Sequence, residues 1–316
     1  MGSEDENLEA PAEKKGLFKK RLKAWWDGYE LEKEKAAAIA VDDSRDYVPA
    51  PEEGPPTVKG WSISRQKSVV TLFGEGMVRS IPDDTKTKLT RPLGINKKLS
   101  ITELGSGLGG FARWTSETYN AYVTGYEEDL QLLDAATEMT VMAGLNRKVN
   151  FMTCDFDNFD PKERSADIVY ASEALFCVQN KEKCFQAIRR MLKPTGQFMM
   201  SDFMLEGTPV DAPELAAWRN SEPRLPYLLD VQAIRKLLSS AGFEVSIAEN
   251  VSETYKANVL RAFADYAKRT SDGEKSGHLH EWILKEGEMW MRRIKLMEDG
   301  HLKVFRIYAR VPSEII

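Results

Sequence analysis

The chain has 316 residues, 42% of them hydrophobic, and its 44 Lys and Arg against 49 Asp and Glu leave a formal net charge of −5. This acidic balance argues against a nucleic-acid-binding surface as the main function, and no apolar run approaches the ~18 residues that span a bilayer. Cys154, Cys177 and Cys184 are odd in number and widely spaced, and the histidines have no metal-ligand spacing with them. We therefore expect a reduced, cytoplasmic protein with no disulfide framework and no metal.

Residues 1–60 predict an N-terminal extension. Residues 1–14 are polar and acidic and predict disorder, whereas the proline-rich residues 42–60 predict a linker. Between them, residues 15–40 predict a partly helical stretch in which large apolar side chains alternate with basic ones. This stretch could pack on the folded domain, form a lid over a bound ligand, or make a peripheral membrane contact through residues 15–29.

Residues 61–316 predict one α/β domain. After a helical stretch over 62–80, short β-rich runs alternate with helical runs, a pattern typical of a parallel, doubly wound sheet. The expected strands are 98–104, 121–127, 149–154, 166–172, 196–203, 244–249 and 301–311, and the expected helices between them are 110–119, 129–144, 181–193 and 231–243. A helical insertion over about 253–298 precedes the last strand. We therefore expect a mostly parallel, seven-stranded, Rossmann-like sheet with an antiparallel last strand.

The stretch ITELGSGLGG, residues 101–110, is the strongest local signal. Gly105, Gly107 and Gly110 have the spacing G-x-G-x-x-G and lie between a predicted strand and a predicted helix. Glycines at such a turn let a ligand approach the backbone next to the free N–H groups of the helix start. An ordinary turn can have the same spacing, so the residues around the loop decide what it binds.

Acidic residues accompany the glycines. Glu127 ends the next predicted strand, about 20 residues further on, where a carboxylate can accept hydrogen bonds from ribose hydroxyls. Glu103 lies two residues before the first glycine and suits a positively charged ligand better than a pyrophosphate. Asp155 and Phe156 follow the third strand, where they could bond and cover an adenine. S-adenosyl-L-methionine has a sulfonium, an ammonium, a ribose and an adenine but no phosphate, and it suits this set.

Motifs along the chain resemble those of class I S-adenosylmethionine-dependent methyltransferases. ELGSGLGG, GYEED, CDF and LKPTGQ carry this resemblance over about residues 60–312. LFGEGMVRS, VYASEALFCV, LKPTGQFMMSDF and WMRRIKLMEDGHLKVFRIYAR resemble the phosphoethanolamine N-methyltransferase group in order and spacing. The resemblance implies the methyltransferase fold, S-adenosyl-L-methionine as cofactor with S-adenosyl-L-homocysteine as product, and a small-molecule acceptor.

The resemblance also implies which residues form the site. The cofactor would be held by Ser80, Glu103, Gly105, Ser106, Gly107, Gly109, Glu127, Asp155 and Phe156. Glu173 falls where that group has an aspartate that faces the amine, and Arg293 falls near a basic residue that meets the phosphate end. These correspondences predict N-methylation of an amine that is phosphoethanolamine or a related compound.

Two carboxylates and three aromatic residues are the further candidates for the acceptor site. Glu173 and Asp202 would follow the fourth and fifth strands, at the sheet edge where ligands bind, and a carboxylate there can orient an amine. Each could instead make a cap or turn bond to the backbone. Trp218, Tyr227 and Tyr255 are candidates for an aromatic wall, which favours methylated ammonium groups.

Other functions fit parts of the same pattern. A C- or O-methyltransferase acting on a quinone or a phenolic acceptor would have the same sheet. A non-catalytic S-adenosylmethionine-binding module would share the fold, although the intact glycine loop with its two acids argues for an enzyme. An NAD-dependent dehydrogenase would need a proton-relay residue and a substrate-binding half, and neither is evident in the sequence.

Overall fold

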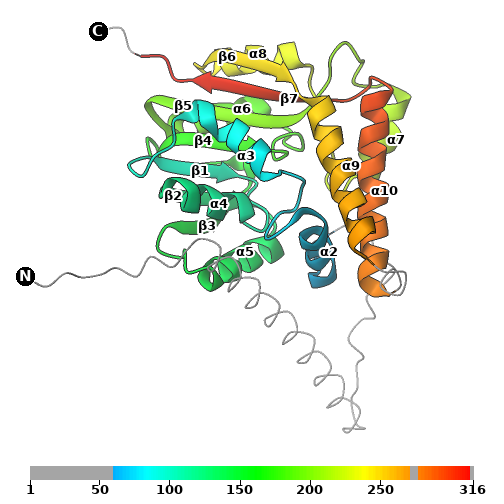
Figure 1. Cartoon of the computed structure of the whole chain (residues 1–316). Coiled ribbons are helices and arrows are strands. Elements are labelled where there is room, and N and C mark those ends of the chain that lie inside the picture. The colour runs from blue at the N-terminus through cyan, green and yellow to red at the C-terminus, as the bar shows by residue number, and fades with distance from the viewer. Residues whose placement is uncertain (1–59, 271–276, 314–316) are drawn as a thin grey trace, which may run out of the picture.

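The computed structural model describes residues 60–270 and 277–313. The predictions for residues 1–59, which include the basic and aromatic stretch and its membrane contact, lie outside the described residues. None of the helices in the described part is long and apolar enough to cross a membrane. Figure 1 shows this part of the chain from α2 (Ile63–Phe73) in blue to β7 (Lys303–Arg310) in red.

A seven-stranded sheet runs through the described part of the chain in the order β3-β2-β1-β4-β5-β7-β6. The strands are β1 (Ser100–Leu104), β2 (Tyr122–Glu127), β3 (Val149–Thr153), β4 (Ala166–Ser172), β5 (Leu192–Met204), β6 (Glu244–Asn250) and β7. The first five in this order are parallel, and β7 lies antiparallel between β5 and β6. The predicted doubly wound, mostly parallel sheet with an antiparallel last strand is confirmed.

Most of the helices alternate with these strands, and several begin at side-chain caps. They are α3 (Asp83–Thr90), α4 (Gly110–Tyr119), α5 (Leu130–Met142), α6 (Lys181–Met191), α7 (Pro213–Ser221), α8 (Val231–Ser240), α9 (Ser252–Arg269), α10 (His278–Glu298) and the short 3₁₀ turns η1 (Arg91–Leu93) and η2 (Phe156–Asn158). Asp129, Asn180 and Asp230 precede α5, α6 and α8, and each side chain accepts a hydrogen bond from a backbone N–H of the first turn. α9 and α10 lie between β6 and β7, within the interval of the expected helical insertion.

The helix expected over residues 62–80 is too long. α2 ends at Phe73 because Gly74 and Gly76 follow with φ of +98° and +68°, which a helix cannot continue through. The chain then passes over the glycine loop, where the Gly110 N–H donates to the Gly76 carbonyl at 2.9 Å. α6 also ends two residues before the predicted boundary, because Leu192 already begins β5. α3 and α7 were not predicted.

The two faces of the sheet bury different side chains of the same strand. On β4, Val169 and Ala171 belong to a core with α6 and α8, whereas Ile168 and Tyr170 belong to a core with α3 and α4. This alternation follows from the period of two in a β-strand. All four side chains are fully buried, so β4 is an internal strand covered on both faces.

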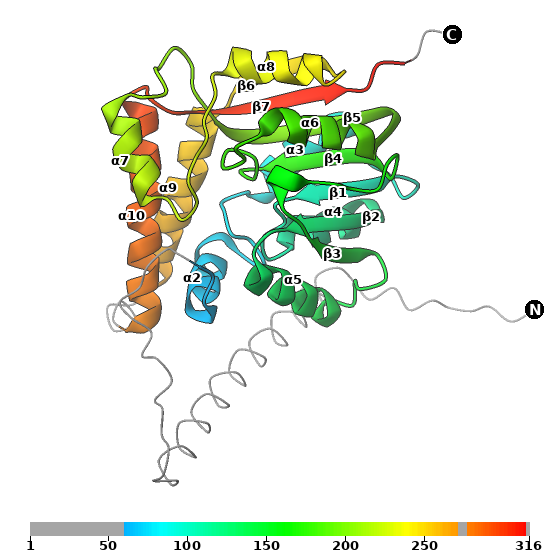
Figure 2. The same cartoon turned by 180° about the vertical axis from the view of Figure 1, so that it is seen from behind.

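Three helices stand apart from these two layers. Figures 1 and 2 both show α2, α9 and α10 beside the end of the sheet at which β7 begins. Because β7 runs antiparallel to β5, this is also the end at which the parallel strands finish. Phe73 of α2 holds them together, with its ring centroid 6.2 Å from that of Phe263 on α9 and 5.4 Å from that of Trp290 on α10. The carboxyl ends of the strands are therefore covered by segments from both ends of the domain.

Candidate functional site

A cavity of about 420 Å³ lies at the carboxyl ends of β1, β2 and β4. Gly105 and Gly107 line it from below, Glu127 and Glu173 from the strand ends, and α2 and α10 close it from the other side. Ligands of open α/β sheets bind at this edge, and a volume of several hundred Å³ is typical of small-molecule sites. The glycine loop, Glu127 and Glu173 are therefore brought together in one cavity.

The glycine loop has a conformation that side chains would disturb. Gly105 and Gly107 have φ of +70° and +55°, where residues with a side chain are rarely found. A Cβ on Gly105 would lie 2.4 Å from the Cβ of Ala174, and a Cβ on Gly107 would lie 2.8 Å from Val78. The loop is tied to β2 by two hydrogen bonds, from the N–H groups of Gly105 and Ser106 to the carbonyl of Tyr126. The cavity floor is thus bare backbone.

Glu127 is fixed at the end of β2 by the backbone around it. Its carboxylate accepts hydrogen bonds from the N–H groups of Gly107 at 2.7 Å, Glu128 at 2.9 Å and Asp129 at 3.1 Å. Burial raises the pKa of Glu127, and these three N–H groups oppose the rise. A carboxylate held in this way lies ready to accept from the hydroxyls of a ribose, as the spacing of the sequence predicts.

Glu103 is buried behind the glycine loop with one oxygen unsatisfied. Burial raises its pKa to about 8, although the positive charge of Arg79 acts in the opposite direction. Oε2 of Glu103 and Oγ of Ser106 are buried without a hydrogen-bond partner. Buried polar atoms without partners next to a bare backbone loop fit a site whose ligand brings its own polar groups, such as the ammonium of an amino acid.

The buried Glu103 predicts a pH dependence of stability. Between its unperturbed pKa of 4.5 and its folded pKa of about 8, the folded chain holds a proton that the unfolded chain has lost. The free energy of unfolding should therefore fall as the pH rises through this window, with up to about 1.4 kcal/mol per pH unit from this one group. In Glu103→Gln this slope should be smaller. Urea unfolding of both proteins from pH 5 to 8 measures it, and parallel pH curves would contradict it.

Phe156 lines the cavity, but its neighbour Asp155 does not. The Asp155 side chain is turned to its own backbone, where it caps η2 by accepting from the N–H of Asp157. Glu128 takes the position expected for Asp155 on the cavity wall. It accepts from the N–H of Phe156 at 2.9 Å and pairs with Arg224. The prediction that Asp155 binds an adenine is therefore not supported by its contacts.

Glu173 comes directly after β4 and faces the cavity. Its φ of +49° is rare for a residue with a side chain, and its N–H donates to the carbonyl of Ser201 at 2.8 Å. The Tyr255 hydroxyl donates to Oε2 of Glu173 at 3.0 Å, and Nη1 of Arg293 lies 3.7 Å from the same oxygen. Burial raises the pKa of Glu173, while Arg79 and Arg293 oppose the rise. A buried carboxylate in a strained backbone at a strand end is typical of a functional position.

Arg293 lines the cavity, but carboxylates already occupy it. Nε and Nη2 of Arg293 donate to the two carboxylate oxygens of Glu222 at 2.9 Å and 2.6 Å, and its Nη1 faces Glu173. The indole N–H of Trp218 donates to Glu222 at 2.5 Å. Trp218 therefore supports the ion pair from behind and is not a cavity wall. These contacts do not support the expected meeting of Arg293 with a phosphate, because Nε and Nη2 donate to Glu222 and Nη1 lies 3.7 Å from Glu173.

Other predicted residues have structural contacts. Asp202 is fully buried and accepts from the N–H groups of Leu175 and Phe203, so it forms the backbone turn bond that was its alternative interpretation. The Ser80 hydroxyl donates to the carbonyl of Asn258. Gly109 is the N-cap of α4 with φ of +74°. Tyr227 lines a separate hollow beside α6 and α8.

Several cavity residues were not predicted because they come from distant segments. Arg65 of α2 forms a buried ion pair with Glu286 of α10 at 2.6 Å, and its guanidinium lies 3.9 Å from the ring centroid of Trp61. Arg79, from the loop after α2, donates to the carbonyl of Gly105 at 2.9 Å. Cys177 also lines the cavity, and burial raises the pKa of its thiol to about 12, so it is no thiolate nucleophile at neutral pH.

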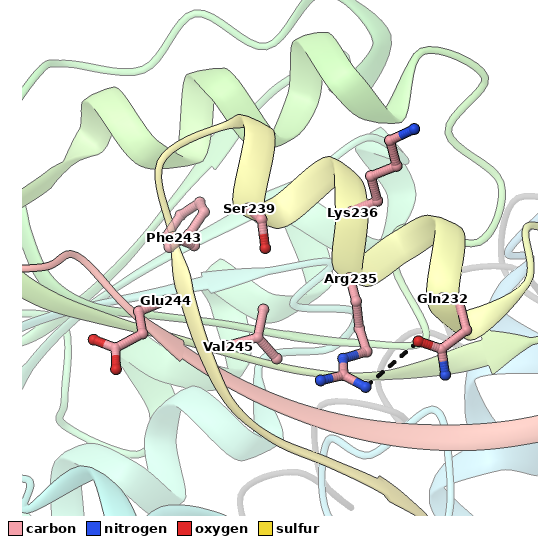
Figure 3. A pocket seen from close by; sticks show the side chains of 7 residues that line it. All are labelled: Gln232, Arg235, Lys236, Ser239, Phe243, Glu244 and Val245. Carbon is pink, nitrogen blue, oxygen red and sulfur yellow. Dashed lines mark hydrogen bonds between the residues drawn. The ribbon is translucent and has the colours of Figure 1, made fainter.

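Another hollow, between α8 and β6, is lined by neither the glycine loop nor Glu127 or Glu173. Figure 3 shows it between α8 and β6, with Arg235 bonded to Gln232 and with the side chains of Lys236 and Glu244 directed to other sides. It lies at the β6 edge of the sheet, four strands away from β1 and its glycine loop. The cavity at the glycine loop is therefore the better candidate for a functional site.

Known proteins resemble this chain in sequence and fold. Residues 102–200 match the family model of a methyltransferase domain. Phosphoethanolamine N-methyltransferase 1 of Triticum aestivum is 28% identical over 198 residues, which cover 62% of this chain and only 39% of the wheat protein. A sterol 24-C-methyltransferase of Neurospora crassa is 32% identical over 117 residues, which cover 37% of this chain and 31% of that protein.

Among solved structures, phosphoethanolamine N-methyltransferase 2 of Haemonchus contortus in complex with S-adenosyl-L-methionine matches with a TM-score of 0.68 and 18% identity. The match covers 78% of this chain and 56% of that one, and it supports the fold. The sequence match lies on the segment from β1 to β5, which contains the glycine loop, Glu127 and Glu173. Residues 102–200 therefore match a methyltransferase domain, and the chain has the fold of the class I S-adenosylmethionine-dependent methyltransferases.

Proposed function

We propose that this chain transfers a methyl group from S-adenosyl-L-methionine to the nitrogen of a small amine. The observation that carries the proposal is the pairing of two features in one cavity: a bare glycine loop with Glu127 at its side, and Glu173 with its carboxylate directed into the same space. The chain spans 39% of the length of the wheat relative, so the activity in that relative's name is support for this proposal and no more.

The residues around the glycine loop fit the cofactor group by group. Glu127 is the acceptor for the ribose hydroxyls, and the buried Phe156 offers a flat surface to the adenine. The unsatisfied Oε2 of Glu103 suits the ammonium. When bound, the cofactor supplies an electrophilic methyl group and its own leaving group, so the protein has to position the acceptor and exclude water.

Glu173 supports an amine as acceptor. Its carboxylate can attract a cationic amine, orient the nitrogen and stabilise the positive charge that the methylated product retains. The Tyr255 hydroxyl and Arg293 hold that carboxylate in one orientation. The acceptor's proton has to leave, and a buried carboxylate with a raised pKa is a suitable group to accept it.

A binding and turnover experiment tests the function. Calorimetric titration with S-adenosyl-L-homocysteine and with NAD tests the cofactor, and methyl transfer from labelled S-adenosyl-L-methionine to a panel of amines and phenols tests the acceptor. We expect binding of S-adenosyl-L-homocysteine, no binding of NAD, and transfer to amines. Label transfer to phenols alone would contradict N-methylation and leave the methyltransferase assignment standing.

Replacing Glu127 by alanine should weaken cofactor binding. The change removes the ribose acceptor and the anchor of three loop N–H groups. Losing a hydrogen bond to a charged group costs roughly 1.5–3 kcal/mol, so the Kd for S-adenosyl-L-homocysteine should rise by about 10- to 150-fold. Calorimetry measures this Kd. The control is Asp134→Ala, which removes an acidic side chain from the exposed face of α5. An unchanged Kd would remove Glu127 from the site.

A second candidate is C- or O-methylation of a neutral acceptor such as a quinone or a phenol. Two observations favour it. Trp61, Phe176 and Trp290 give the cavity an aromatic side, and the ion pair with Glu222 leaves Arg293 without capacity for an anionic group. The similarity to a sterol 24-C-methyltransferase points in the same direction. The acceptor panel separates the two candidates.

A further inference from the structure

We propose that Arg79 binds the carboxylate of the cofactor's amino-acid part. The inference rests on the proposed use of S-adenosyl-L-methionine and concerns a residue that neither the motif pattern nor the resemblance assigned. Arg79 belongs to the loop between α2 and α3 and is 9% exposed. It lines the cavity beside Gly105 and Gly107, and its Nη2 donates to the Gly105 carbonyl at 2.9 Å.

The charges in the cavity single out Arg79. The other arginines that line it are each paired with a carboxylate: Arg65 with Glu286, Arg224 with Glu128, and Arg293 with Glu222. Arg79 has no carboxylate oxygen within 4.0 Å in the described part of the chain. Its Nε is buried without any hydrogen-bond partner. An almost fully buried cation in this state is costly unless a ligand completes it.

The acids near Arg79 are committed elsewhere. Both oxygens of Glu127 accept from backbone N–H groups. Oε2 of Glu173 accepts from the Tyr255 hydroxyl and lies 3.7 Å from Nη1 of Arg293, so the charge of Arg79 acts on Glu173 without forming an ion pair with it. Burial raises the pKa of Glu103 to about 8, so this side chain is mostly neutral at pH 7 and does not supply the missing charge. The cavity therefore has one open cationic position, next to the glycine loop.

The chemistry of the cofactor matches this position. S-adenosyl-L-methionine has several cationic and neutral groups but only one anion, the carboxylate of its amino acid. Glu127 holds one side of the glycine loop through the N–H of Gly107, and Arg79 holds the other side through the carbonyl of Gly105. If Glu127 held the ribose, Arg79 on the Gly105 side of the loop would be the residue to bind the amino-acid carboxylate, because a guanidinium can bind a carboxylate with two donors.

Two ligands that differ only in the amino-acid part test the assignment. S-adenosyl-L-homocysteine has the carboxylate, whereas 5′-methylthioadenosine keeps the adenosine and the sulfur but lacks the amino acid. In Arg79→Gln, calorimetry should show affinity for S-adenosyl-L-homocysteine reduced by about 10- to 150-fold and affinity for methylthioadenosine within about 3-fold of wild type. Arg79→Lys, which keeps a positive charge, should retain part of the affinity. Arg292→Gln on the outer face of α10 is the control for loss of one charge.

The methyl ester of S-adenosyl-L-homocysteine gives a second measurement on the wild-type protein, because it removes the anion from the ligand and leaves the protein unchanged. Its affinity should be reduced by a similar factor. Equal losses of both ligands in Arg79→Gln would make Arg79 a support of the loop and overturn the assignment, and so would equal wild-type affinities for acid and ester. If the wild-type protein binds neither ligand, the proposed cofactor itself is wrong.

Discussion

Replacing Glu173 by glutamine should lower the turnover of an amine acceptor by on the order of 100-fold or more, the usual scale for the loss of an acid–base or electrostatic group at a reacting centre. Glutamine keeps the size of the side chain and can still accept from the Tyr255 hydroxyl, but it has no charge to attract the amine or stabilise the ammonium product. The measurement is kcat and KM for the best amine found in the panel, with wild type and Glu173→Gln.

The controls separate the acceptor from the cofactor. The Kd for S-adenosyl-L-homocysteine should change little in Glu173→Gln, because Glu127 and the glycine loop remain intact. Glu288→Gln, at a half-exposed position of α10, removes an acid without touching the cavity and should behave like wild type. Near-wild-type turnover of a confirmed amine by Glu173→Gln would rule out this role. With a phenolic acceptor, KM should be almost unaffected, because that substrate carries no positive charge.

Replacing Glu222 by alanine should lower the free energy of unfolding by about 3–5 kcal/mol, the usual cost of leaving a buried charge without its partner. The variant removes both acceptors of the two-pronged bond from Arg293, at 2.9 Å and 2.6 Å, and leaves the Trp218 N–H without an acceptor. Arg293 and Glu222 are both almost completely buried, so water cannot replace the lost contacts. Urea unfolding followed by circular dichroism measures the change.

The neighbouring ion pair on the same helix is the matched control. Arg292 lies 4.0 Å from Glu288 and both side chains are about half exposed, so Glu288→Ala should change stability by no more than about 0.5 kcal/mol. The double variant Glu222→Ala with Arg293→Met should recover part of the loss, because no unpaired charge then remains inside. A single Glu222→Ala variant within about 1 kcal/mol of wild type would show that Arg293 finds another partner, with Glu173 the nearest.

Strands, helices and the glycine loop are predicted well from the sequence, because residues close together in the chain determine them. The strand that ends with ITEL, the bare loop and Glu127 follow from spacing within about 25 residues, and the mostly parallel sheet follows from the alternation of strands with helices. Glu173 is a candidate because it follows a recognisable strand end and because of the resemblance, and its role stays a prediction. The confirmed fold and the position of the glycine loop rest on the same kind of local signal.

The errors concern pairs whose partners are far apart in the chain. Glu222 binds Arg293 across 71 residues, and neither side chain has a local signature that identifies the other. The phosphate role of Arg293 came from the resemblance, and the sequence does not show that Glu222 binds this side chain. The contacts of Asp155 and Asp202 do not support their predicted roles, because backbone N–H groups close at hand bind each carboxylate and neither side chain lines the cavity. An acidic residue at the end of a helix or strand can bind either the neighbouring backbone or a ligand. Only its tertiary contacts show which of the two it does.

The bond between Arg65 and Glu286 spans 221 residues, and it has a consequence for how the protein matures on the ribosome. The strands β1 to β5 and the glycine loop emerge early, and the parallel pairings among these strands are made within that part of the chain, whereas β5 gains its second neighbour, β7, only near the end. The wall made by α10 is synthesised near the end, and contacts of such large sequence separation form late. A nascent chain that has completed β5 thus has its parallel sheet before it has an enclosed cavity. The side of the cavity that Glu286, Met289, Trp290 and Arg293 line is therefore added only after α10 has been translated.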